Sequence, residues 1–284
     1  MDQLDARILP ANASLRFGKE ICWYDGRLRQ EGNVNRNRRS SFSFLLGLLG
    51  IVISTSAIAM WGGAVGAAPD YRAVVASSDR TEADRNEDER RKPAQLLEFA
   101  NVRLGMSVLE IGAGGGYTAE LLARTVGAKG VVYAQNAKPQ VRFEERAKQS
   151  TAMKNVVSAI RPFDDPVPPE AKDLDLVTLI LFYHDIVYMP VDRAKMNRRL
   201  FEALKPGGHF IVVDHAAKAG ADIGVGKTLH RIDEATVRRE VEAAGFQLEA
   251  QSDFLRNPTD PREKPFFRMD EPTDRFALKF VKPR

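Results

Sequence analysis

The fold is decided by the stretch VLEIGAGGGY, residues 108–117. Its apolar first half predicts a short buried strand, and residues 118–124 predict a helix. Between them lie glycines at 112, 114, 115 and 116, which permit positive φ and let the backbone approach a ligand closely. Strand, glycine turn and helix form the first crossover of a nucleotide-binding α/β sheet.

The chain beyond this stretch alternates strand patterns with helical ones. The predicted strands cover residues 131–134, 156–160, 174–182, 209–213, 246–254 and 276–281, and the predicted helices cover 93–100, 139–149, 192–204 and 233–244. No helical pattern separates the last two strands. We therefore predict an α/β fold with a doubly wound, mostly parallel seven-stranded sheet, helices on both faces and an antiparallel last strand.

Charge and cysteine content exclude several classes of protein. The formal net charge is +4, but the first 68 residues hold eight of the 42 Lys and Arg and five of the 38 Asp and Glu. Residues 69–284 therefore hold 34 basic and 33 acidic residues, too even a balance for a nucleic-acid partner. Cys22 is the only cysteine, which excludes a disulfide framework and a cysteine metal site.

The first 68 residues have the pattern of an export leader. Arginines at 36, 38 and 39 precede an apolar run over residues 42–60, and small residues continue to Ala68. We predict a signal peptide cleaved after Ala67 or Ala68, which would place the domain in the periplasm. Two alternatives stay open: residues 42–68 could remain as a membrane anchor, or translation could start downstream and leave the domain in the cytoplasm.

A charged segment, residues 69–92, separates this leader from the domain. Its composition predicts a solvated arm or a short helix, and Pro93 fits the first turn of the helix that follows. We expect that helix to serve packing, with covering of a ligand pocket as the alternative. The predicted organisation is a leader over 1–68, an arm over 69–92 and one domain over 93–284.

The glycine spacing distinguishes between nucleotide-binding folds. The dinucleotide fingerprint G-x-G-x-x-G needs glycine or alanine at position 117, where this chain has Tyr117. The pattern present is E-x-G-x-G-x-G over residues 110–116. Together with the Lys-Pro-Gly-Gly turn at 205–208 and the closing strand pair, it resembles the class I S-adenosylmethionine-dependent methyltransferases over about residues 93–283.

A narrower resemblance is to a bacterial group of predicted exported methyltransferases with a Tyr-His-Asp step after the fourth strand. The matching segments are Tyr183-His184-Asp185, Val213-Asp214-His215, KTLHRID at 227–233, and Arg256-Asn257-Pro258. The family resemblance implies S-adenosylmethionine as the cofactor.

The resemblance also implies which residues hold that cofactor. Glu110 matches the acid that binds the methionine ammonium, with a carboxylate that merely caps the turn as the alternative. Backbone at Gly112, Gly114 and Gly116 approaches the methionine and ribose portions.

Two further cofactor positions follow the second and third strands. The family usually has an acid for the ribose hydroxyls where this chain has Gln135 and Asn136, whose amides bind a diol without charge assistance. Asp164 or Asp165 is the candidate for the adenine amino group, with an ordinary turn aspartate as the alternative.

Candidate acceptor residues follow the fourth and fifth strands, at the carboxyl edge where ligands bind in open α/β sheets. One hypothesis makes His184 a base oriented by an acid; in the other, its segment only shapes the pocket. The candidate catalytic residues are Tyr183, His184 and Asp185, and the candidate substrate-binding residues are Asp214, His215, His230 and Arg231. Histidines and aspartates there would permit zinc or iron, but no short ligand spacing supports a metal site, so we predict none.

The sequence therefore predicts an S-adenosylmethionine-dependent methyltransferase with a small-molecule acceptor that it does not identify. One alternative is a binding or regulatory protein of the same fold without turnover, which Gln135 and Asn136 favour. The other is a nicotinamide-dependent oxidoreductase, which Tyr117 and the closing strand pair disfavour. Membrane contact is expected only through the apolar leader, if it is uncleaved.

Overall fold

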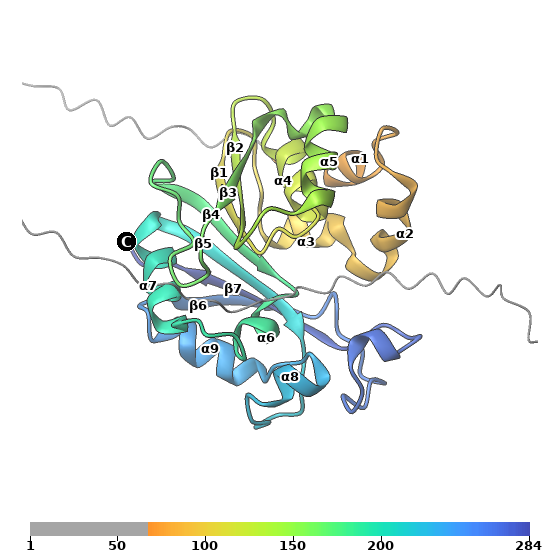
Figure 1. Ribbon diagram of the computed structural model, residues 1–284, viewed down its shortest axis with the longest axis vertical. Coiled ribbons are helices and arrows are strands. Elements are labelled where there is room, and N and C mark those ends of the chain that lie inside the picture. The colour runs from red at the N-terminus through yellow and green to blue at the C-terminus, as the bar shows by residue number, and fades with distance from the viewer. Residues whose placement is uncertain (1–67) are drawn as a thin grey trace, which may run out of the picture. The chain divides into compact units, whose positions relative to one another are not determined.

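The computed structural model describes residues 68–284, which form a single sheet with helices on both faces (Figure 1). The strands are β1 (Ser107–Ile111), β2 (Val131–Asn136), β3 (Val156–Ile160), β4 (Leu174–Ile180), β5 (Leu204–His215), β6 (Gln247–Ser252) and β7 (Arg275–Val281). Their order across the sheet is β3-β2-β1-β4-β5-β7-β6. β7 pairs antiparallel with β5 and β6, and every other pair of strands is parallel, which confirms the predicted fold class.

Alternate residues of the central strands fill two separate cores. In β1, Leu109 and Ile111 face one core, whereas Val108 faces the other, as the two-residue period of a strand requires. The first core is closed by α7 (Arg193–Ala203) and α9 (Glu234–Glu242), and the second by α3 (Pro93–Phe99) and α4 (Tyr117–Val126). α5 (Val141–Gln149) packs near β2 through Phe143. Helices therefore cover both faces, and ligands can reach only the edges of the sheet.

Two short helices and the start of the fifth strand differ from the sequence predictions. Two helices went unpredicted, α6 (Tyr183–Ile186) and α8 (Val225–Leu229), because four or five residues are too few for a helical period to emerge. The fifth strand begins at Leu204, so the predicted turn at 205–208 lies within β5, where the pairing with β4 shifts register. Positive φ at Gly207 lets the chain make that irregularity without ending the strand.

The charged arm forms two helices, α1 (Tyr71–Val75) and α2 (Glu82–Arg91). Every residue of α2 except Ala83 is polar, and ion pairs hold the helix: Arg80 binds Asp88 at 2.6 Å, and Arg146 of α5 binds Asp84 at 2.5 Å. The arm is therefore attached to the domain and does not simply extend into solvent.

Within residues 68–284, no helix is both long enough and apolar enough to cross a membrane. The predicted signal peptide, anchor and alternative start all lie in residues 1–67, outside the described part of the chain.

Candidate functional site

The carboxyl ends of β1, β4 and β5 bring the predicted site residues to one edge of the sheet. β1 pairs with β4 and β4 pairs with β5, all in parallel. The glycine turn follows β1, α6 follows β4, and Asp214 and His215 end β5. Parallel strands that end together place these segments side by side, as the sequence predicted.

The glycines of the turn have two different roles: two of them avoid a clash with a neighbouring ring, and one leaves open space beside the backbone. At Gly112 (φ 67°) a Cβ atom would lie 2.6 Å from the Phe182 ring, and at Gly116 (φ 85°) it would lie 3.0 Å from Phe143. At Gly114 (φ 53°) the nearest such atom is the Gly112 carbonyl oxygen, 3.9 Å away. Gly114 is therefore the position where the turn leaves open space beside the backbone for a ligand.

Gln135 and Asn136 hold the glycine turn in place. Gln135 Oε1 accepts from the Gly112 amide at 3.1 Å, and its Nε2 donates to the Arg161 carbonyl at 2.6 Å. Asn136 Oδ1 accepts from the Gly114 amide at 2.9 Å. An acid could accept from these amides but could not donate to the Arg161 carbonyl, which gives a structural reason for amides here. Their predicted contact with a ribose stays a prediction.

Glu110 is a buried acid beneath the turn with an unsatisfied oxygen. Its Oε2 has no hydrogen-bond partner, and the residue is 3% exposed. Burial raises the pKa of Glu110 to about 8, although a hydrogen bond from Thr118 and the charges of Arg91 and Arg146 oppose that shift. Such a carboxyl group gains a charged partner if a ligand brings an ammonium group to it.

Asp164 and Asp165 are engaged in ion pairs with α7. Asp164 binds Lys195 at 3.0 Å, and Asp165 binds Arg199 at 2.9 Å and also Arg161. The bond from Arg199 is the main reason why the pKa of Asp165 lies below its usual value. Contact with an adenine would have to share or replace these partners.

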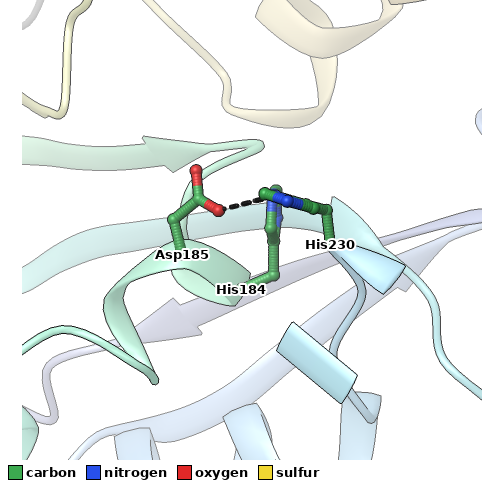
Figure 2. A group of neighbouring side chains, drawn as sticks. All are labelled: His184, Asp185 and His230. Carbon is green, nitrogen blue, oxygen red and sulfur yellow. Dashed lines mark hydrogen bonds and ion pairs between the residues drawn. The ribbon is translucent and has the colours of Figure 1, made fainter. Parts of the chain in front are cut away.

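His184 is the buried centre of a second group of side chains, shown in Figure 2. Its Nδ1 lies 2.6 Å from Asp214 Oδ1, and because a carboxylate can only accept, the proton sits on Nδ1. Asp214 is itself fixed by the backbone amides of His184 and His215 at 2.8 and 2.7 Å. His184 Nε2 is buried and has no hydrogen-bond partner. The orienting acid for His184 is thus Asp214, on a neighbouring strand.

Asp185 and His230 complete this group. Asp185 Oδ1 accepts from the Tyr188 hydroxyl at 2.7 Å and lies 2.9 Å from His230 Nδ1 (Figure 2). The same oxygen lies 3.3 Å from His184 Nε2. Candidate ligand atoms of His184, Asp185 and His230 all lie within 4.8 Å of one another. We call these three residues the histidine cluster.

Electrostatics couples the members of the cluster. Burial by itself would lower the pKa of His184, but the charge and hydrogen bond of Asp214 outweigh it, so that pKa lies above its usual value. Burial would raise the pKa of Asp185, but His230, His184 and Tyr188 together bring it below its usual value. Both shifts favour the charged forms: an Asp185 carboxylate beside a His184 ring that takes up a proton more readily than a free imidazole.

Besides Asp214, three predicted catalytic or substrate-binding residues lie outside the cluster. The Tyr183 hydroxyl points into the first core, where it donates to Glu240 at 2.8 Å and accepts from Asn197 at 3.0 Å. Arg231 is fully buried and paired with Asp260 at 2.8 Å. His215 is also buried; it contacts Thr273 at 2.6 Å and stacks on Phe266 at 4.6 Å between ring centroids. Burial and nearby cations hold its pKa well below the usual value.

Two residues that contact the site were not predicted from the sequence. Arg146 Nε donates to the Gly115 carbonyl at 2.8 Å while its other nitrogens bind Asp84 and Glu120, so one residue ties the arm to the glycine turn. Phe266 stacks on the His215 ring and meets the His184 ring edge-on. Neither residue carries a local signal, because each acts on partners distant in sequence.

A small pocket lies between the arm, the start of α4 and the ends of β4 and β5. It is lined by Arg91, Leu96, Tyr117, Thr118, Ile180, Leu181, Val213, Leu255 and Arg275. Thr118 also bonds to Glu110, so this pocket adjoins the acid with the unsatisfied oxygen.

Comparison with known families identifies the fold. A family model described as "Methyltransferase domain" matches residues 85–251, more than half of the chain. The chain belongs to this methyltransferase family. S-adenosylmethionine is the cofactor of the family, and Glu110 and the open position at Gly114 are suited to its methionine end.

The most similar curated proteins include the protein-L-isoaspartate O-methyltransferase of Pyrococcus horikoshii, 32% identical over 120 residues. That similarity covers 42% of this chain and 49% of the relative, so the chain spans about half the length of the first relatives that it matches. Methyltransferase GfsG of Streptomyces halstedii is 27% identical over 199 residues, covering 64% of this chain and 68% of that protein.

Solved structures share the fold. An S-adenosylmethionine-dependent methyltransferase from Aquifex aeolicus superposes with a TM-score of 0.52 at 19% identity, over 69% of this chain and 93% of that one. A putative sarcosine dimethylglycine methyltransferase from Galdieria sulphuraria gives 0.52 at 17% identity, over 72% and 91%. The fold of residues 68–284 is therefore one that these solved methyltransferases share.

Proposed function

We propose that this chain transfers the methyl group of S-adenosylmethionine to a small-molecule acceptor bound at the histidine cluster. One observation carries the proposal: at the carboxyl edge, Glu110 Oε2 and His184 Nε2 are buried atoms without hydrogen-bond partners. The first lies on β1 and the second follows β4, its neighbour in the sheet. One is suited to the cofactor's ammonium group and the other to an acceptor.

The cofactor, when bound, supplies a methyl group on a positively charged sulfur. Glu110 binds the ammonium group, and the backbone at Gly114 gives the methionine end room. Gln135 and Asn136 keep the turn in shape. The family resemblance assigns the ribose to these two residues and the adenine to Asp164 or Asp165.

The acceptor atom faces His184 Nε2, with Asp185 and His230 beside it and Asp214 as the positioning residue. The acceptor atom forms a bond to the methyl carbon while the carbon–sulfur bond breaks and leaves its electron pair on sulfur. If the acceptor is a hydroxyl, its proton must leave, and the cluster assists that loss. Tyr183 and Arg231, buried and bonded elsewhere, support the fold around the acceptor.

We also propose that the chain belongs to the exported bacterial group with the Tyr-His-Asp step and that its domain acts in the periplasm. The leader pattern at 36–68 and the Tyr183-His184-Asp185 segment support this proposal. The even charge balance of residues 69–284 supports the absence of a nucleic-acid partner. N-terminal sequencing of the protein from separated cell fractions tests the proposed export. An uncleaved chain in the membrane fraction would indicate the membrane anchor, and a chain found in the cytoplasm would overturn the proposal.

Calorimetry of the full-length chain tests the cofactor site. We expect S-adenosylhomocysteine, the demethylated product, to bind, and NAD not to bind. Gly114→Arg should abolish binding because the new side chain fills the open space. Gly105→Arg is the matched control: φ there is 81° and a Cβ atom would meet nothing within 4 Å, but the residue lies ahead of β1. Equal loss in both variants, or NAD binding instead, would contradict the site.

Turnover separates an enzyme from a binding protein. We expect methyl transfer to at least one member of an acceptor panel that includes hydroxylated and amine-bearing small molecules and an isoaspartyl peptide. His184→Ala should lower kcat by at least about 100-fold and leave the affinity for S-adenosylhomocysteine unchanged. Binding without turnover across the panel would favour the regulatory alternative.

A further inference from the structure

We propose that the histidine cluster binds one divalent transition-metal ion through His184 Nε2, a carboxylate oxygen of Asp185 and a ring nitrogen of His230. The sequence predicted no metal, because the three residues are not spaced as a ligand motif. This inference rests on the proposed function, since the ion would sit where the acceptor binds.

The distances between the three residues suit one ion. Bonds of about 2.1 Å from a metal to nitrogen or oxygen separate adjacent ligand atoms by roughly 3.0–3.4 Å. Asp185 Oδ1 lies 3.3 Å from His184 Nε2 and 2.9 Å from His230 Nδ1. Small side-chain rotations would therefore bring all three onto one centre. Two imidazoles and one carboxylate on one side of the ion suit zinc or ferrous iron and leave positions open for a substrate.

Two observations support His184 Nε2 as a ligand of the metal ion. Its Nε2 is buried, lacks a hydrogen-bond partner and faces the other two members of the cluster. Its Nδ1 bonds to Asp214 at 2.6 Å, so the neutral ring that a metal binds carries its lone pair on Nε2. A carboxylate behind a ligating histidine is the usual outer support of a metal site, because it fixes the tautomer and ring orientation.

The remaining ligands are also fixed by their surroundings. Tyr188 donates to Asp185 Oδ1 at 2.7 Å. His230 ends α8 with φ at 51°, a left-handed conformation that costs free energy in a residue with a side chain. Backbone bonds from Ile232 to His215, and from Ala217 to Ile232, hold that segment against β5. The fold thus keeps His230 in a strained position that presents its ring to Asp185.

The outer side of the cluster is accessible. The His230 side chain is 26% exposed and that of Asp185 is 19% exposed, whereas His184 is 2% exposed. Phe267, which is half exposed, packs edge-on against His230 at 5.3 Å. Open coordination positions would therefore face a partly apolar approach, as a hydroxylated organic acceptor requires.

The ion would activate a hydroxyl acceptor. Coordination of the hydroxyl oxygen lowers its pKa, so the oxygen–hydrogen bond breaks and the proton passes to solvent. The oxygen then forms its bond to the methyl carbon, and the carbon–sulfur bond breaks with its electron pair left on sulfur. No electron is gained or lost by the ion, so the step needs no oxidant.

Zinc titration of the full-length, untagged, chelator-treated chain tests the proposal. We expect one Zn²⁺ per chain. His230→Ala should weaken binding by at least about 100-fold, and Asp214→Asn, which removes outer support, by about 10–100-fold. His209→Ala is the matched control, because His209 pairs with Glu249 on β6 at 3.1 Å and takes no part in the cluster; it should bind zinc as the wild type does.

Each outcome has a distinct meaning. Absence of a stoichiometric ion in the wild type would overturn the metal site, as would zinc affinity that His230→Ala leaves unchanged. S-adenosylhomocysteine affinity, measured on the same samples, reports folding of the variants and tests the proposed function separately. Cofactor binding without zinc binding rejects only the metal; loss of both in the wild type rejects the proposed function.

Discussion

At the scale of single residues, buried polar atoms without hydrogen-bond partners mark the candidate site more clearly than charged side chains do. Five buried side-chain atoms in residues 68–284 lack a hydrogen-bond partner, and Glu110 Oε2 and His184 Nε2 are the two at the carboxyl edge beside the proposed ligands. Each such atom costs about 1–3 kcal/mol. A fold that retains this cost where ligands bind recovers it on binding.

The raised pKa of Glu110 predicts that ligand binding releases a proton. Folding raises its pKa from 4.5 to about 8, so the folded chain holds a proton there that the unfolded chain releases, and stability falls as pH rises through this window. A bound ammonium favours the carboxylate instead. S-adenosylhomocysteine binding at pH 7 should therefore release roughly one proton.

Calorimetry in buffers of different ionisation enthalpy measures that release. Glu110→Gln is the matched control, since the ligand carries the same ammonium group but the acid is gone. Its binding should be weaker and should release almost no proton. Equal proton release in both proteins would mean that Glu110 does not meet the ammonium group.

At the scale of elements, the glycine turn is built jointly by segments distant in the chain. β2 supplies Gln135 and Asn136 to its amides, and α5 supplies Arg146 to the Gly115 carbonyl. Arg146 also binds Asp84 of α2, so the arm and the turn share one residue. This ion-pair group should therefore be one of the contacts that hold the arm against the domain.

Arg146→Ala tests this dependence. The side chains of Asp84 and Glu120 are 9% and 5% exposed, and Asp84 would lose its main partner, so we expect the free energy of unfolding to fall by about 3 kcal/mol in urea titrations. Arg199→Ala, which removes a half-exposed ion pair with Asp165, should cost less than about 1 kcal/mol. Limited proteolysis should cut residues 70–92 faster only in the first variant; unchanged cleavage would show that the arm is held by other contacts.

At the scale of the whole molecule, the connection between β6 and β7 is anchored across the site. Arg231 and Asp260 form an ion pair with both side chains fully buried, and Arg231 also donates to the carbonyls of Ala216 and Lys264. Asp260 accepts from the Asp274 amide at 2.6 Å. This pair fixes the segment that carries Phe266 against His184 and His215.

Asp260→Asn should loosen that segment. Loss of the charge leaves a buried guanidinium unpaired, at a cost of about 3 kcal/mol. Amide hydrogen exchange should then speed up over residues 256–274 and stay slow in β1. Glu263→Gln is the control, because its pair with Lys218 is largely exposed, and it should change nothing. Unchanged exchange over 256–274 in Asp260→Asn would show that the pair does not anchor the segment.

The sequence by itself determined the mostly parallel seven-stranded sheet, its antiparallel last strand and the glycine turn after the first strand. These features are encoded locally, in the two-residue period of apolar strands, in helical spacing and in a glycine pattern within seven residues of Glu110. It also placed Asp214 and His184 at one edge, because parallel strands must end together.

Only the tertiary structure decided which of those residues act together. It paired His184 Nδ1 with Asp214 and brought His230 to Asp185 across 45 residues. It also turned Tyr183 into the core and buried Arg231 against Asp260. The physical reason is that side-chain direction and burial depend on packing between segments distant in the chain. Neither side-chain direction nor burial can be predicted from residues that are neighbours in the sequence.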